Sequence, residues 1–337
     1  MRKHTLLLFL LLMAMPVLAE NRSFRQAREI AERHAAKNGA HIGQQSVKRA
    51  KVLNKQQSTT SSRGYYVFPH DGNCGYTIVS GDDRMPEIVG YSTTDTYSEE
   101  NMPDGMKHLM QAYEAMATAL AKGDAKAKRC LAEKKALVAD STYRQPRVAP
   151  LLADVVWGQT EPYNNLCPMY DGQRTVTGCV ATAMAQLMMY YQYPQTLKSD
   201  IPAYQTSSYQ LNMPSVAAGE RYDWDNMLSQ YSGSAYTAAQ ANAVAKLMYH
   251  CGLSVKADYG PSTGAWCTPN VLVKYWGYAP DVIKHLYREN FSLREWTAIL
   301  DAELQASRPV YYSGFSTTSG GHAFLCDGAD GDGLYHI

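Results

Sequence analysis

One cysteine stands where a buried helix is expected to begin. Cys179 follows Thr177 and Gly178 and opens an apolar run that predicts a helix over 179–190. The free N–H groups and partial positive charge of a helix N-terminus favour a thiolate, and they can also face a developing oxyanion. A core cysteine without chemical function is the alternative, because most free cysteines are small buried residues. Position alone leaves both interpretations open.

A histidine far downstream could serve as the general base for this thiol. His322 follows Gly320 and Gly321 and begins an apolar strand. The two glycines would let the segment approach another closely, as a base must approach its nucleophile. A core histidine satisfied by the sheet is the alternative. Upstream of the cysteine, Gln159 offers an amide that could donate to an oxyanion. The order glutamine, cysteine, histidine is typical of papain-like enzymes.

Other candidate groups fit the chemistry less well. His336 is a rival base, but it lacks flanking glycines and alternates with strand residues. Asp327, Asp330 and Asp332 do not have the spacing of an EF-hand loop, and a Gly/Asp hairpin turn explains them better. No cysteine or histidine cluster has the spacing of zinc ligands. We therefore expect no metal and no cofactor.

The chain has seven cysteines, and an odd number leaves at least one thiol unpaired after export. Oxidation would inactivate a nucleophile, so we expect Cys179 to be the unpaired one. Cys251 ends an apolar helix and Cys326 lies in an apolar strand, so both are predicted core residues. The others occupy turn-like or linker contexts, where pairing stays open and its connectivity unreadable: Cys74, Cys130, Cys167 and Cys267.

The first residues read as a secretory signal peptide, which predicts a secreted protein. A basic start, an apolar run over 6–13 and small residues before Glu20 place the signal at 1–19. A membrane anchor is the alternative, but this run is shorter than the roughly 20 residues of a bilayer span. The net charge of +1 offers no electrostatic reason to bind nucleic acid or a membrane surface. We expect no membrane span in the mature chain.

The rest of the chain is long enough for two domains of roughly 150 residues each. The first should be a small α+β unit without evident catalytic residues. Ser23 can cap a helix that ends before Gly39. After this helix we expect a strand over 47–53, a meander over 65–68, 76–80 and 88–91, and a helix over 106–122. The segment from Lys126 to Arg147 is charged and contains Pro146, which is typical of a linker or a solvated helix face.

The second domain places helices first and an antiparallel sheet after them. Besides the helix at Cys179, helices are expected over 236–251, closed by Gly252, and over 291–306, with Ser292 as the N-cap. Strands are expected over 310–312, 322–326 and 334–337. The fold class is therefore α+β.

Longer motifs resemble one family, the streptopain family of cysteine peptidases. In the second domain the similar segments are 177–188 with Tyr193-Pro194, 258–262, 309–312, 320–324 and 327–330. In the first domain, 75–82 and 88–92 are similar to the family's propeptide. The resemblance implies a papain-like catalytic domain over 145–337, preceded by an inhibitory pro-domain over 20–144. Its partners would be protein or peptide substrates and its own pro-domain.

The resemblance also implies roles for individual residues. Cys179 would be the nucleophile, His322 the base and Gln159 the oxyanion donor. The activity would be that of a broad endopeptidase favouring an apolar residue one before the scissile-bond residue. Maturation would fall at Arg144–Gln145, and Asn101 would occupy the active-site region of the zymogen. Residues expected to contact substrate are Tyr259, Gly260, Pro261, Ser262, Gly320 and Gly321.

The sequence departs from the family pattern in one respect. Family members continue after the strand that matches Tyr335–Ile337 into an Asn-Trp-Gly-Trp-Gly-Gly segment that orients the catalytic histidine, whereas this sequence ends at Ile337. An unsupported histidine can adopt the wrong orientation or tautomer. This departure keeps open a non-catalytic peptidase-like binder or inhibitor. An acyl transferase that uses the same cysteine and histidine is a third alternative and would require an amine acceptor.

Overall fold

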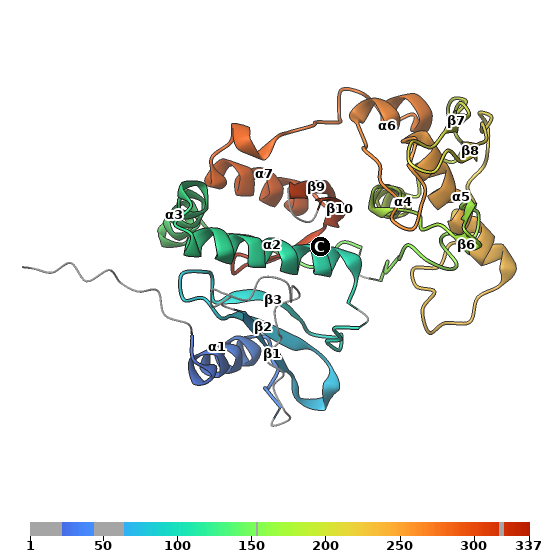
Figure 1. The fold of residues 1–337 in the computed structure, drawn as a ribbon. Helices are drawn as coiled ribbons and strands as arrows, with labels where there is room; N and C mark the ends of the chain where they lie inside the picture. The colour runs from blue at the N-terminus through green and yellow to red at the C-terminus, as the bar shows by residue number, and fades with distance from the viewer. Residues whose placement is uncertain (1–21, 44–63, 101, 153, 317–319) are drawn as a thin grey trace, which may run out of the picture. The chain divides into compact units, whose positions relative to one another are not determined.

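The computed structural model describes residues 22–43, 64–100, 102–152, 154–316 and 320–337 (Figure 1). The predicted signal peptide, the strand over 47–53 and Asn101 lie outside these residues. The chain divides into two compact units. The first comprises Met1–Met102 and Tyr113–Leu131, and the second comprises Pro103–Ala112 and Ala132–Ile337. Across the described residues, no helix combines the length and apolar character needed to cross a bilayer.

The first unit packs one helix on a three-stranded meander, as predicted. Helix α1 (Phe24–Lys37) begins after Ser23, whose hydroxyl forms a capping box with Gln26. The strands β1 (Tyr65–Pro69), β2 (Tyr76–Ser80) and β3 (Ile88–Ser92) are antiparallel in the order β1-β2-β3. The α1 face that carries Ala27 and Ile30 is buried against Phe68 of the sheet.

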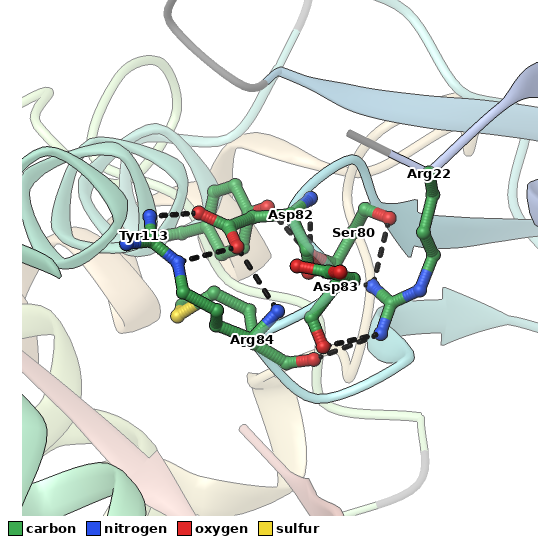
Figure 2. A network of polar contacts seen from close by, with 7 residues as sticks. Arg22, Ser80, Asp82, Asp83, Arg84 and Tyr113 are labelled. Carbon is green, nitrogen blue, oxygen red and sulfur yellow. Dashed lines mark hydrogen bonds and ion pairs between the residues drawn. The ribbon is translucent and has the colours of Figure 1, made fainter. Parts of the chain in front are cut away.

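A polar network fixes the turn between β2 and β3 (Figure 2). The Arg22 guanidinium donates to the carbonyls of Ser80 and Asp82, and the fully buried Asp82 carboxylate accepts two hydrogen bonds from the Arg84 guanidinium. The hydroxyls of Ser80 and Tyr113 lie 2.8 Å apart. A buried carboxylate is tolerated when it is paired in this way, so the network ties the turn to the helix that carries Tyr113.

Two helices follow the meander and cross the division between the units. The first, α2 (Asp104–Ala121), was predicted. The second, α3 (Ala125–Ala139), shows that most of the charged segment is the solvated helix of the two predicted alternatives and not a linker. It starts where the Asp124 carboxylate accepts a hydrogen bond from the Ala127 N–H, and it buries Ala127 and Leu137 while most of its other residues are exposed. Asp124 after Gly123 is a helix-start signal, but the charged composition of the segment that follows obscured it in the sequence.

The second unit joins a helical part to a small antiparallel sheet (Figure 1). The main helices of this unit are α4 (Cys179–Tyr191), α5 (Ala238–Ser254), α6 (Pro269–Trp276) and α7 (Leu293–Gln305), with 3-10 turns at Trp224–Asn226 and Arg288–Asn290. Helix α4 packs against α5 and against the strand β10 (Gly320–Cys326), and the core around α4 contains Met184, Met188 and Leu247. Ser292 caps α7 through a capping box with Glu295, as expected.

The strands of this unit form two main sheets. In one, β9 (Val310–Ser316) pairs antiparallel with β10 (Gly320–Cys326), and His322 lies opposite Gly314. In the other, β11 (Gly328–Asp330) lies between β12 (Tyr335–His336) and β4 (Arg147–Val148). Two short hairpins complete the set: β5 (Met169–Tyr170) with β6 (Gln173–Arg174), and β7 (Tyr204–Gln205) with β8 (Asn212–Met213). The α+β fold class is confirmed.

One predicted helix end is wrong. Gly252 lies inside α5, which continues to Ser254, instead of closing the helix. A Cβ at this position would lie 2.1 Å from the Tyr259 hydroxyl. The glycine therefore serves the close approach of the buried Tyr259 ring to the helix and does not mark a C-terminus.

Candidate active site

Cys179 is the first residue of α4, and the helix start around it is built by backbone rather than by capping side chains. Gly178 is the N-cap, with φ of 85°, and no side chain caps the helix. Thr182 donates from its N–H and its hydroxyl to the Gly178 carbonyl. The N–H groups of the first turn are thus left without a capping side chain beside the Cys179 thiol, which suits them to an anionic group.

The predicted oxyanion donor lies in the segment next to this helix start. The Thr177 N–H donates to the Gln159 carbonyl over 3.1 Å. Since Thr177 lies two residues before Cys179, this bond holds the backbone of Gln159 next to the start of the helix. The Gln159 side chain is half-buried. The structure therefore brings the backbone of Gln159 next to the segment that leads into Cys179.

The loop predicted to flank the cleft is also tied to this point. Thr263 donates from its hydroxyl to the Val176 carbonyl over 2.7 Å, and a Cβ at Gly178 would lie 2.9 Å from the Thr263 carbonyl oxygen. Pro261 and Ser262 are exposed at the tip. The glycine N-cap thus permits contact between the loop and the start of α4.

Two residues of this loop have buried positions that limit what they can touch. The Tyr259 side chain is fully buried, and its hydroxyl donates to the Tyr249 carbonyl. Gly260 is buried under Tyr209, whose Cε2 would lie 2.3 Å from an added Cβ. Tyr259 and Gly260 therefore support the loop from within, while the exposed tip faces solvent.

His322 lies on a different face of the sheet from the one that packs on the nucleophile helix. Side chains alternate between the two faces of a strand. Ala323 and Leu325 of β10 are buried in the core cluster against which Cys179 packs. The His322 ring instead stacks on Phe324, at 6.4 Å between centroids, on the other face. In the described residues no hydrogen bond joins His322 to Cys179.

The start of α2 covers the His322 ring, and sequence reasoning missed this contact. The rings of His108 and His322 stack with centroids 5.3 Å apart and planes 25° apart. One turn earlier, a Cβ at Gly105 would lie 3.3 Å from His322 Nε2, so the absence of a side chain lets the helix approach the imidazole. The pKa of His322 is lowered, first by burial and then by His108, while Asp104 opposes the shift. His108 carried no local motif that could have indicated the contact.

The remaining thiols differ from Cys179 in their surroundings. All seven cysteines are free. Burial raises the pKa of Cys167, Cys267 and Cys326 to about 12, and that of Cys251 well above the ordinary value. These four thiols stay protonated at neutral pH and are poor nucleophiles. The predicted core positions of Cys251 and Cys326 are confirmed, since both are buried.

The proposed maturation junction is anchored on both sides. Before it, the Tyr143 hydroxyl donates to the buried Asp301 carboxylate over 2.9 Å. After it, Gln145 accepts a hydrogen bond from the Gly333 N–H and donates to the Leu334 carbonyl. The Arg144 side chain between them is exposed. At the proposed junction, Arg144 is thus exposed to solvent, while Tyr143 before it and Gln145 after it are held by hydrogen bonds.

The rival base is engaged elsewhere. His336 Nδ1 lies 2.6 Å from the Asp327 carboxylate, whose second oxygen accepts from the Leu152 N–H. Asp330 accepts hydrogen bonds from the backbone of Asp332 and Leu334, which is the hairpin turn expected from the sequence. Within the described chain, no group of three His, Cys, Asp or Glu side chains could hold a metal ion.

Comparison with known proteins places this arrangement in a family. The Peptidase C10 family matches residues 157–337, and the Spi protease inhibitor family matches residues 16–117. The chain belongs to the Peptidase C10 family. It is a cysteine peptidase that carries a Spi-type pro-domain. The pro-domain match precedes the peptidase match along the chain, which is the order predicted from the sequence.

Individual C10 peptidases and their relatives agree with this assignment. Streptopain of Streptococcus pyogenes is 36% identical over 292 residues, which cover 78% of this chain and 68% of streptopain. The thiol protease/hemagglutinin PrtT of Porphyromonas gingivalis is 30% identical, over 81% of this chain and 32% of that protein.

Solved structures of a cysteine protease from Prevotella intermedia also match. Prointerpain A of Prevotella intermedia superposes with a TM-score of 0.68 at 30% identity, covering 86% of each chain. The active form, interpain A, superposes with a TM-score of 0.51 at 36% identity, over 56% of this chain and 80% of its own. The precursor thus matches the larger share of this chain.

Proposed function

We propose that the chain is a secreted cysteine endopeptidase made as a zymogen, with Cys179 as nucleophile, His322 as general base and acid, and Gln159 as oxyanion donor. The observation that supports this most strongly is the position of Cys179 at the uncapped start of α4, beside the fixed backbone of Gln159. The first-turn N–H groups and the Gln159 amide would donate to the same oxyanion.

In the proposed reaction His322 takes the proton of the Cys179 thiol, and the resulting thiolate attacks the carbonyl carbon of the scissile peptide. The carbonyl electron pair moves to oxygen, and the resulting anion is held by the N–H donors at the start of α4 and by Gln159. Collapse of this intermediate breaks the C–N bond, and His322 gives its proton to the leaving amine. Water, deprotonated by His322, then hydrolyses the thioester and regenerates the thiol.

The zymogen form would be latent because His322 is held away from this site. The stack of His108 on His322 and the approach of Gly105 to Nε2 occupy the imidazole that the reaction requires. Activation would remove α2 and let His322 turn toward Cys179. The first two residues of β10 are glycines, and Gly320 has a φ of 76°, so the backbone before the histidine carries little steric restriction. The inhibitory role proposed for Asn101 concerns a residue outside the described part.

Maturation and substrate binding complete the proposal. Cleavage between Arg144 and Gln145 would separate the pro-domain from the catalytic domain, at an exposed arginine between two anchored neighbours. The exposed loop tip at Pro261 and Ser262, with Gly320 and Gly321, would line the cleft. We propose protein or peptide substrates with an apolar residue one before the scissile-bond residue.

The decisive experiment compares the full-length wild type with Cys179→Ala, each purified to homogeneity. The variant should show no self-processing in the 140s and no peptidase activity, while its folding is unchanged because Ala also fits a helix start. Cys251→Ala serves as the matched control, since it removes a buried thiol that cannot act. A thiol-directed epoxide should modify the matured wild type at Cys179 selectively. Unchanged processing in pure Cys179→Ala protein would sink the self-maturation claim.

A further inference from the structure

We propose that His108 and His322 form an acid-sensitive latch: the uncharged rings hold the start of α2 on the catalytic histidine, and their protonation releases it. This inference rests on the proposed roles of His322 and α2 and adds a regulatory signal to them. The contact joins two imidazoles from segments far apart in the sequence, both within the second unit.

The geometry favours neutral rings. With centroids 5.3 Å apart and planes 25° apart, the two rings lie nearly parallel to each other. Two neutral imidazoles can stack in this way, whereas two imidazolium ions at that separation repel each other. Imidazoles change charge between pH 5 and 8, so the contact between the two rings changes from attractive to repulsive within this pH range.

The charged groups around His322 do not cancel this repulsion. On α2, Asp104 attracts a protonated His322, but its carboxylate is paired with Lys107 over 3.2 Å. On the strands, Gly314 lies opposite His322, and Tyr311 and Tyr312 are phenols whose pKa is raised by burial, so they stay neutral. Phe324, an uncharged ring, lies beside His322 on the same face of the strand, with ring centroids 6.4 Å apart. From α4, the nearby titratable group is the thiol of Cys179, behind the sheet.

Proton linkage gives the direction of the effect. In the docked state the pKa of His322 is lowered, mainly by burial and then by His108. Release of α2 removes both causes, so the released state binds more protons than the docked state. Acidification therefore favours release, fully so below the pKa of the docked histidine, and docking recovers as the pH rises above the pKa of the released one. Each unit of pKa difference between the states shifts the equilibrium by up to tenfold.

The test uses the full-length chain with Cys179→Ala, so that no self-processing can occur. Hydrogen–deuterium exchange of the 104–112 segment is measured at pH 7.5 and 5.5 and corrected for the intrinsic pH dependence of exchange. We expect protection of this segment to fall about tenfold at pH 5.5. Exchange in α5 is followed in parallel, because it reports unfolding of the whole unit rather than release of α2.

Substitutions at His108 separate the latch from a general effect of acid. His108→Phe keeps a stacking ring that cannot be charged, so the segment should lose less protection at pH 5.5 than in the parent, and only the acid sensitivity that comes from burial of His322 should remain. His108→Lys places a permanent charge against His322 and should expose the segment already at pH 7.5. His285→Phe is the matched control, since it removes an exposed histidine stacked on Tyr287 and should behave like the parent.

The outcomes are distinct. Equal protection of 104–112 at the two pH values in the parent chain would overturn the latch, as would full acid sensitivity in His108→Phe. Loss of protection in both 104–112 and α5 would also count against it, because the unit would then be unfolding. The readout requires no catalysis. Failure of the latch is therefore separate from failure of the proposed function, which the activity of wild type against Cys179→Ala decides.

Discussion

Gly178 shows how a single residue type controls the start of the nucleophile helix. Its φ of 85° and ψ of 148° lie in a region that side chains rarely adopt, and an added Cβ would lie 2.9 Å from the Thr263 carbonyl oxygen. Both constraints act on the residue immediately before Cys179. The position of the Cys179 thiol and the position of the loop that carries Thr263 are therefore coupled through this glycine.

We predict that Gly178→Ala destabilises the catalytic unit by about 1–3 kcal/mol and lowers kcat, because the backbone must move or the loop must withdraw. Gly219→Ala is the matched control: Gly219 has φ of 89°, but nothing lies within 4 Å of its added Cβ. Thermal unfolding and peptidase kinetics measure both effects. If the two variants lose the same activity, contact with Thr263 has no role in placing the thiol.

At the scale of elements, the segment before the mature domain is bound to α7 and β12 through one carboxylate. Asp301 of α7 accepts hydrogen bonds from the hydroxyls of Tyr143 and Tyr335, at 2.9 and 2.8 Å. Burial raises the pKa of Asp301, and the two phenol donors oppose this shift. The pair of hydroxyls compensates a buried carboxylate, and only the hydroxyl of Tyr143 lies next to the proposed maturation junction.

We predict that Tyr143→Phe makes Arg144 more accessible to added trypsin, whereas Tyr335→Phe does not. Each variant loses one hydrogen bond to the same carboxylate, so their stability losses should be similar, about 1 kcal/mol. Only the first frees the chain next to Arg144, and its cleavage should be about fivefold faster. Rates are compared in the Cys179→Ala background, and equal acceleration in the two variants would contradict a specific anchoring role.

At the scale of the whole catalytic unit, one buried histidine ties stability to pH. His250 of α5 is 7% exposed, and its Nδ1 lies 3.0 Å from the Tyr222 hydroxyl. Burial, followed by the charge of Lys246, lowers its pKa to about 4, with Glu220 acting in the opposite direction. The folded unit thus binds fewer protons at His250 than the unfolded chain does.

We therefore predict that the catalytic unit loses stability as the pH falls from about 6.5 toward 4, by on the order of 3 kcal/mol from this group. Denaturant unfolding of the matured enzyme at several pH values measures the slope. His250→Gln keeps a polar side chain and should flatten this part of the profile, while His285→Phe should not. A slope unchanged in His250→Gln would assign the acid sensitivity to other groups.

The sequence by itself determined the local elements and the identity of the chemical groups. Ser23 and Ser292 start their helices through capping boxes that need only residues three positions on, and the meander follows from turn residues between short apolar runs. Cys179, Gln159 and His322 were recognised by residue type and order. These signals depend on residues close together in the sequence, so they can be interpreted without knowing how the elements pack.

Only the tertiary structure decided how those groups are arranged. His108 lies on His322, Gly252 serves the Tyr259 ring, and His322 occupies the sheet face opposite to the one that packs on the Cys179 helix. None of these relations has a sequence pattern, because each depends on which faces of distant elements are buried together. The sequence predicts a catalytic cysteine and histidine by residue type and order, whereas packing decides that the His322 ring and the Cys179 helix lie on different faces of β10.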